Sequence, residues 1–189
     1  MSIRKTFTIL AVCTLSTLTI FPHPVIAQSK DSTFFQQGYN RKFVVGTYIL
    51  STFLNGKFVG RRVITLTQDG SFFTIDSNQG GTKGVPAAAQ SFPNNRFTDG
   101  QGVWKFNKSG EITATALNFN FPAPESTASV TAARADYRFR FNRTTQTVEG
   151  TFEIRTFDLT KNPLDKNVPV GKGEPFTFSF TGQRVTVSD

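Results

Sequence analysis

From Val45 almost to the C-terminus, apolar and polar residues alternate with a period of two. This alternation is typical of β-strands that bury one face, whereas a surface helix repeats every 3.6 residues. In the stretch 131–141, small or aromatic residues take the odd positions, and charged residues take the even positions from Arg134 onward. No segment has the pattern of a long amphipathic helix, so the sequence predicts an all-β protein.

Tight turns divide this alternating region into separate strands. Asn55-Gly56 is the strongest hairpin signal, because both residues tolerate a positive φ. Asp69-Gly70 and Ser109-Gly110 are similar turn signals. We therefore expect eight strands, at residues 45–54, 57–67, 71–79, 101–107, 111–121, 129–142, 147–159 and 176–187.

Each expected strand has one apolar and one polar face, and no helix is expected to cover a sheet. Antiparallel strands of this kind bury their apolar faces either by closing into a barrel or by forming a sandwich. Short turns between consecutive strands favour an up-and-down order, and eight strands enclose a lumen that can hold one small ligand. We predict a calycin-like, eight-stranded antiparallel up-and-down β-barrel over residues 43–189, with a β-sandwich as the alternative.

The expected connections differ in length between the two ends of the barrel. Those after the second, fourth and sixth strands are tight, whereas residues 80–100, 122–128 and 160–175 form longer connections at the other end. Long loops in compact domains are often binding loops. Small residues such as Ala133 and Ala135 face inward near the long loops, so we expect a filled base and an open mouth.

The last expected strand carries the side chains that close the base. Its inward phenylalanines are followed in the same phase by Arg184, and closure of the barrel would place Arg184 beside Tyr48. A guanidinium that lies across an aromatic ring contributes ~0.5–2 kcal/mol. We predict that the structural base consists of Tyr48, Phe106, Tyr137, Phe139, Phe180 and Arg184.

The first 27 residues have the organisation of a secretory signal peptide. Arg4-Lys5 precede an apolar run, and small residues lead to a cleavage position after Ala27. Prolines stop the run short of the ~20 residues that span a membrane. We predict a secreted or periplasmic protein with no transmembrane segment after cleavage, in which residues 28–42 form a flexible N-terminal segment. The alternative is a lipoprotein attached through Cys13, which follows an apolar trio.

Cleavage would remove the only Cys, His and Met of the chain. Without thiolate or imidazole, zinc and copper sites of the usual kinds and catalysis by Cys or His are excluded. The loss of Arg4 and Lys5 lowers the net charge from +8 to +6, and no run of five like charges occurs. Aromatic and basic residues near Tyr137 lie on opposite faces and cannot share one bound strand. We predict no metal, no cofactor and no nucleic-acid partner.

Arg62 is the most informative candidate for ligand binding. It shares its phase with Phe58 and Ile64, and should therefore point into the lumen. A buried guanidinium needs a partner, which is either Asp158 or Tyr137 within the protein, or a carboxylate or phosphate of a ligand. Trp104 is expected beside Arg62, and aromatic residues are expected near the mouth. The candidate ligand-binding residues are Arg62, Trp104, Phe119, Phe121, Thr156, Phe176 and Phe178.

Two groups of motifs resemble known families. Gly46-Thr47-Tyr48, taken with Arg184 on the last strand, resembles the calycin pattern of lipocalins and their relatives. The stretches 102–105, 133–138 and 182–185 are similar to a group of secreted bacterial proteins with no assigned function, whose barrel is thought to be like that of allene oxide cyclase. The resemblance covers residues 45–187, and implies a barrel that binds an apolar ligand or guides a cyclisation.

Three functions remain open from the sequence. The first is a secreted barrel that binds a small apolar or amphipathic molecule in its lumen. An amphipathic ligand of this kind could be anionic. The second is a cyclase similar to allene oxide cyclase, which is weakened because no well-placed inward carboxylate is expected. Asp158 is inward by phase but lies at the rim, and Asp76 would be inward only if its strand had the opposite phase. The third is a structural protein with a filled barrel. The sequence does not fix the oligomeric state.

Overall fold

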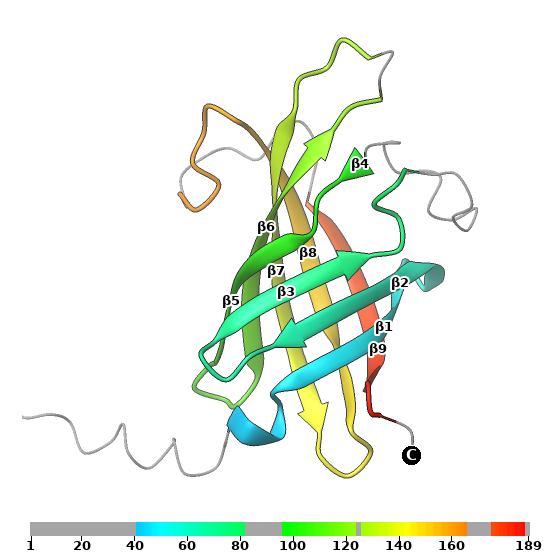
Figure 1. Ribbon diagram of the computed structural model, residues 1–189, viewed down its shortest axis with the longest axis vertical. Coiled ribbons are helices and arrows are strands. Elements are labelled where there is room, and N and C mark those ends of the chain that lie inside the picture. Colours follow the sequence, from blue (N-terminus) through cyan, green and yellow to red (C-terminus); the bar gives the residue numbers. More distant parts are fainter. Residues whose placement is uncertain (1–40, 82–95, 124–125, 166–174, 188–189) are drawn as a thin grey trace, which may run out of the picture. The chain divides into compact units, whose positions relative to one another are not determined.

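The computed structural model describes residues 41–81, 96–123, 126–165 and 175–187 (Figure 1). Its described residues form nine strands and one turn of 3₁₀ helix. The predicted signal peptide and residues 28–40 lie outside these ranges. The elements are η1 (Arg41–Phe43), β1 (Gly46–Leu54), β2 (Lys57–Leu66), β3 (Ser71–Asp76), β4 (Arg96–Phe97), β5 (Gly100–Phe106), β6 (Ile112–Phe121), β7 (Thr131–Asn142), β8 (Thr147–Asp158) and β9 (Phe176–Arg184).

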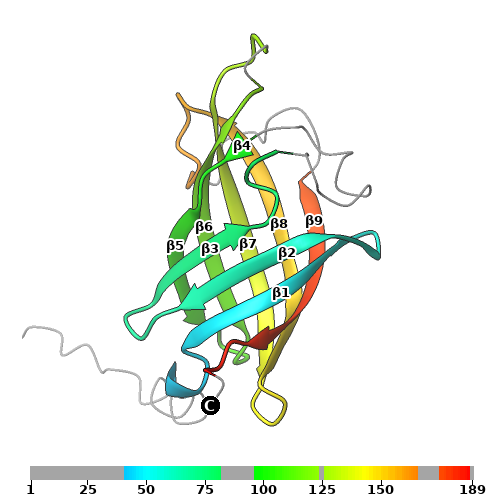
Figure 2. The ribbon, with the colours of Figure 1, turned by 45° about the vertical axis from the view of Figure 1, so that its right-hand side comes forward.

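Eight of the strands close into an antiparallel β-barrel, as predicted (Figures 1 and 2). The order around the barrel is β6-β5-β3-β2-β1-β9-β8-β7, and pairing of β6 with β7 completes the ring. The first and last strands are neighbours, with Tyr48 opposite Arg184. The sandwich alternative is therefore wrong.

The short strand β4 was not expected from the sequence. Among the described strands it pairs with β6 alone, where Arg96 lies opposite Phe121 and Phe97 opposite Asn120. Thr98 and Asp99 separate it from β5, and the backbone N–H of Thr98 donates to the carbonyl oxygen of Phe119. A two-residue strand shows no alternation, so its sequence carries no periodic signal.

The connections are arranged as the sequence predicts. The tight connections β2–β3, β5–β6 and β7–β8 lie at one end, called the base here, and the described parts of the longer connections lie at the other end, the mouth (Figures 1 and 2). Asn55 and Gly56 both adopt positive φ, at 50° and 76°, in the hairpin between β1 and β2. Residues 82–95, 124–125 and 166–174 of the longer connections lie outside the described ranges.

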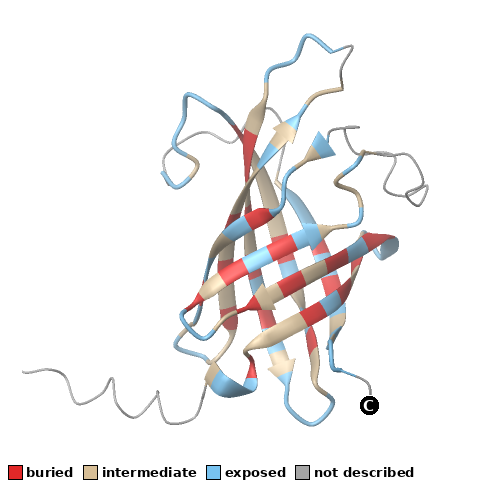
Figure 3. Cartoon of the chain, in the orientation of Figure 1, coloured by how far each residue is buried: buried red, intermediate tan, exposed pale blue. Residues whose placement is uncertain are grey.

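Aromatic side chains fill the lower lumen. Buried and exposed residues alternate along the strands (Figure 3), and each phenylalanine removed from water stabilises the fold by ~1.5–3 kcal/mol. The rings of Phe139 and Phe180 meet edge to face at 5.7 Å, and those of Phe152 and Phe178 stack at 4.7 Å. The largest side chains that are completely buried are Tyr48, Phe72, Tyr137, Phe139, Phe152 and Phe180.

Arg184 caps the base as predicted. Its guanidinium carbon lies 5.4 Å from the centre of the Tyr48 ring, and its Nη2 donates to the carbonyl oxygens of Phe43 (2.8 Å) and Val45 (2.6 Å). Burial raises the pKa of Tyr48, although nearby Arg184 opposes the rise. Gly46 makes room for this arrangement: its φ is 152°, and an added Cβ would lie 3.0 Å from Nε of Arg184. The guanidinium therefore fastens β9 to η1 and to the start of β1.

Two phase predictions are wrong. Phe58 does not share the inward phase of Arg62, because a bulge places Thr52 opposite Gly60 and Phe53 opposite Phe58. Val59 is the additional residue and is buried, whereas Phe58 is exposed. The phase of β3 is also opposite to the expected one, which brings Asp76 into the lumen.

Candidate ligand-binding site

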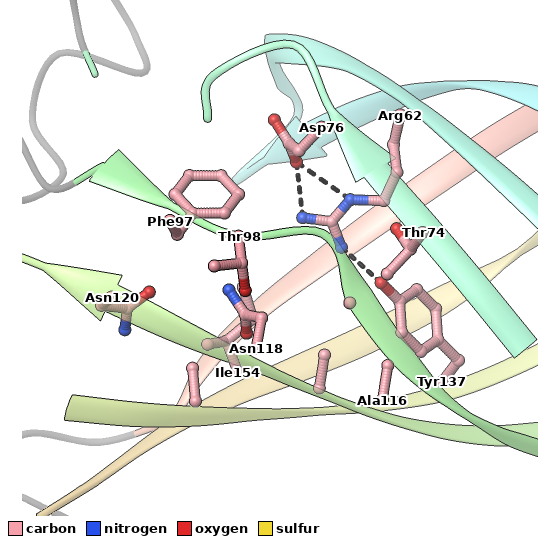
Figure 4. Close-up of a pocket in the computed structure, with 13 residues that line it drawn as sticks. Arg62, Thr74, Asp76, Phe97, Thr98, Ala116, Asn118, Asn120, Tyr137 and Ile154 are labelled. Atoms are coloured by element: carbon pink, nitrogen blue, oxygen red, sulfur yellow. Dashed lines mark hydrogen bonds and ion pairs between the residues drawn. The ribbon is translucent and has the colours of Figure 1, made fainter. Parts of the chain in front are cut away.

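A cavity of about 80 Å³ lies in the lumen above the aromatic base (Figure 4). Residues from seven strands, β2 to β8, line it. Gly100, Ala116, Ala133 and Ala135 leave the space open, since larger residues at these inward positions would fill it. The remaining lining residues are Arg62, Thr74, Asp76, Phe97, Thr98, Asn118, Asn120, Tyr137 and Ile154.

Arg62 points into the lumen, as predicted, and is 7% exposed. Its Nε and Nη2 donate to Oδ2 of Asp76 at 2.9 and 2.5 Å, and its Nη1 donates to the Tyr137 hydroxyl at 2.6 Å. The guanidinium carbon also lies 4.2 Å from the centre of the Phe152 ring. The buried charge is thus paired within the protein. Tyr137 is a partner as predicted, whereas the alternative Asp158 is exposed and bonds to Thr160 instead.

The pairing keeps Arg62 charged. Burial alone would lower its pKa, but Tyr137 and Asp76 together raise that pKa above its ordinary value. The second carboxylate oxygen of Asp76, Oδ1, accepts the backbone N–H of Asn78 at 2.9 Å. Both oxygens of Asp76 are therefore occupied as acceptors.

Asp76 is the site residue that the sequence placed wrongly. In the segment 71–76 both phases contain an apolar residue, and the odd phase contains Phe73 and Ile75. In the structure these two are 42% and 49% exposed, whereas Phe72 and Thr74 are buried. The β2–β3 register sets Asp76 directly opposite Arg62, so the inward ion pair satisfies a charge that would otherwise be buried alone.

Tyr137 forms the floor of the cavity rather than part of the base. Its ring stacks on Phe152 at 5.0 Å and meets Phe72 at 4.9 Å, and its hydroxyl faces the guanidinium of Arg62 (Figure 4). The prediction that Tyr137 belongs to the base is therefore wrong, because Tyr137 lies one layer of side chains closer to the mouth. The other predicted base residues lie in the core or are packed against it: Tyr48, Phe106, Phe139 and Phe180.

Polar groups without partners remain around the cavity. Thr74 is only 8% exposed, and its buried hydroxyl has no hydrogen-bond partner among the described residues. Within the same described ranges, the Asn118 side chain also has no partner, and Asn120 makes only a long contact of 3.5 Å to the Thr131 hydroxyl. Gly100 keeps the position of Thr74 free, because an added Cβ would lie 2.4 Å from the Thr74 methyl group.

Trp104 lies at the base and not beside Arg62. Its indole N–H donates to the carbonyl oxygen of Thr67 at 3.0 Å, and the guanidinium of Arg41 lies 5.2 Å from its ring centre. The sequence predicts correctly that Trp104 points inward, but not its position along the barrel axis. The Ser71–Val103 pairing of β3 and β5 sets this position, and the sequence does not contain it.

Phe119 and Phe121 point outward, so their predicted place at the rim of the lumen is wrong. They are 51% and 42% exposed. The inward phase of β6 instead passes from Ile112 through Ala116 to Asn118 and Asn120. This signal was present in the sequence, because the small residues before position 118 already define the phase.

The other three candidates lie outside the lining of the cavity. Phe178 is buried in the aromatic layer against Phe152, and Phe176, two residues closer to the mouth, is 48% exposed. Thr156 is half-buried on β8. Of the seven predicted ligand-binding residues, the structure places only Arg62 in this cavity.

Within the described ranges, no three His, Cys, Asp or Glu side chains are grouped so as to hold a metal ion, and no helix is long and apolar enough to cross a membrane. No family model, curated protein or solved structure matches the chain.

Proposed function

We propose that this barrel binds one small amphipathic molecule in the cavity above Tyr137. The observation that carries the proposal is a set of polar groups around an empty space inside an otherwise apolar barrel, including the Thr74 hydroxyl, which has no partner among the described residues. Concave sites with a few placed polar groups and mostly apolar walls are typical of small-molecule binding. The lining of alanines, Ile154 and Phe97 supplies such walls.

Two alternatives are less well supported. A filled structural barrel would need side chains in the space that Ala133 and Ala135 leave open. A cyclase would need a free acid or base, and although Asp76 is an inward carboxylate, its oxygens already accept three hydrogen bonds from Arg62 and Asn78. A carboxylate held in this way is poorly suited to remove a proton from a substrate.

The proposal includes export from the cytoplasm and membership of a calycin-like group. The signal-peptide pattern before Gln28 supports export. The cap of Arg184 over Tyr48, next to η1, supports the resemblance to calycins. Mass spectrometry of the protein from its own host should give a mature N-terminus at Gln28; an intact N-terminus at Met1 would contradict export.

The binding proposal can be tested by filling the cavity. Replacement Ala135→Leu adds a branched side chain at a buried lining position, and Thr151→Leu adds the same side chain at an exposed position on β8. We expect 1-hexanol, a probe on the scale of the cavity, to bind the unaltered protein and Thr151→Leu in calorimetric titrations, and to bind folded Ala135→Leu at least about tenfold more weakly. Equal binding by all three proteins would contradict a ligand in this cavity.

A further inference from the structure

We infer that the cavity selects an uncharged head group that carries an oxygen, either a carbonyl or a hydroxyl, over a carboxylate, a phosphate or an amine. This inference rests on the proposed function, because it names the chemical class of the ligand that the cavity binds. It differs from the expectation that an anionic ligand pairs with Arg62.

The charges at the cavity are already balanced. Among the described side chains that line it, only Arg62 and Asp76 are charged, and Nη2 of Arg62 lies 2.5 Å from Oδ2 of Asp76. An anionic head that approached Arg62 would lose its water and also approach the carboxylate of Asp76. An ammonium would meet the guanidinium in the same way. A buried charge without its own counter-charge is strongly disfavoured, so both kinds of ligand are rejected.

The hydrogen-bonding groups fit an uncharged oxygen. The Tyr137 oxygen accepts from Arg62, so the hydrogen of this hydroxyl remains available to a ligand. The Thr74 hydroxyl and the Asn118 amide have no partners among the described residues. All three side chains are drawn around the same space in Figure 4. A carbonyl or hydroxyl oxygen can accept from such donors without bringing a charge into the lumen.

The size of the cavity sets the scale of the head group. Its volume of about 80 Å³ is well below the roughly 300–1,000 Å³ of sites for drug-sized ligands. The space fits a polar head and a few carbon atoms. Six-carbon probes are therefore suitable, and they differ only at the group that the cavity is expected to recognise.

A matched series of ligands tests the inference on the unaltered protein. 2-Hexanone, 1-hexanol, hexanoate, hexylammonium and hexane are compared at pH 7 by isothermal titration calorimetry, with native mass spectrometry to count bound molecules. We expect 2-hexanone and 1-hexanol to bind at least about tenfold more tightly than hexanoate and hexylammonium. They should also bind more tightly than hexane, because the site is left with unpaired polar groups when the oxygen is missing.

The outcomes separate this inference from the proposed function. Binding of hexanoate, hexylammonium or hexane as tight as that of the neutral oxygen compounds would overturn the head-group inference and leave a binding barrel. If none of the five compounds binds, both the inference and the proposed function are overturned.

The variant Thr74→Val tests the unpartnered hydroxyl directly, since valine has nearly the same shape. We expect this variant to bind 2-hexanone about fivefold more weakly while its affinity for hexane is unchanged. Its melting temperature without ligand should rise, because a buried hydroxyl without a partner is removed. Thr52→Val is the matched control: the Thr52 hydroxyl is also buried without a partner in the described residues, but Thr52 does not line this cavity. It should raise the melting temperature and leave 2-hexanone binding unchanged; an unchanged affinity in Thr74→Val would overturn the role of Thr74.

Discussion

The guanidinium of Arg62 carries a positive charge inside an aromatic barrel, where it is paired with the carboxylate of Asp76. Its three hydrogen bonds to Asp76 and Tyr137 compensate for the loss of water, and the Phe152 ring covers one face. A buried ion pair of this kind contributes little net stability, but removal of one partner is costly. We interpret the pair as a device that fixes the position of the Tyr137 hydroxyl and keeps the cavity polar but uncharged.

Asp76→Asn should lower the free energy of unfolding by about 3 kcal/mol, because Arg62 would remain buried without its counter-charge. Asp136→Asn is the matched control, since Asp136 pairs with Arg134 in a more accessible position at 2.8 Å. It should cost less than about 1 kcal/mol. Urea unfolding followed by Trp104 fluorescence measures both values, and a loss of equal size would show that the Arg62–Asp76 pair is not special.

At the level of single strands, the sequence predicts where strands lie more reliably than which way they face. The eight expected strands all occur, because period-two alternation and positive-φ turns mark them clearly. Phase is lost where both faces of a segment are apolar, as in 71–76, and where a bulge inserts a residue, as at Val59. The height of Trp104 depends on cross-strand register, which is a long-range property.

The candidate site was predictable only where one strand contained all the information. Arg62, Ala133 and Ala135 follow the phase of their own strands and were placed inward correctly. The inward orientation of Asp76 could be predicted only if the phase of β3 were known, and Phe97 belongs to a strand that is too short to show an alternating pattern. The inward orientation of Asn118 and Asn120 is predictable from the small residues earlier in β6, but the sequence-based prediction assigns ligand contacts to the neighbouring Phe119 and Phe121.

The element that closes the base depends on Arg184. Replacement Arg184→Lys keeps the charge but cannot reproduce contacts to Gln146, Tyr48 and the carbonyl oxygens of Phe43 and Val45. We expect the free energy of unfolding to fall by about 2 kcal/mol. Arg138→Lys, at an exposed position on β7, should have almost no effect. Equal urea midpoints for the two variants would argue against a fastening role for Arg184.

The β2–β3 turn should respond to acid. The pKa of Asp69 is lowered first by a hydrogen bond from the Thr67 hydroxyl and then by the backbone N–H of Ser71. A carboxyl whose folded pKa is lowered contributes stability above its unfolded pKa and loses it as the pH falls through the folded value. Asp69→Ala should therefore melt at a lower temperature at pH 7, and the difference should shrink as the pH falls below the ordinary Asp value of 3.8 and disappear once the pH is below the lowered pKa of the folded state. A difference that persists unchanged in acid would contradict this origin.

In the whole barrel, stability and binding occupy different levels. The base is filled by aromatic rings and capped by Arg184, whereas the level above Tyr137 is lined by small and polar residues. The filled level provides the folding core that a chain without disulfides needs. The level above it can then tolerate an empty space and unpartnered polar groups, which are the features that suit a ligand.

The most direct measurement is an NMR titration of the folded protein with 2-hexanone, with methyl groups assigned. The methyl signals of Ala116, Ala133, Ala135 and Thr74 should shift in a saturable way, because these residues line the cavity, whereas that of Ile49, exposed on the outer face, should not. Saturable shifts confined to outer-face methyl groups, or no shifts at all, would contradict a ligand site inside the barrel.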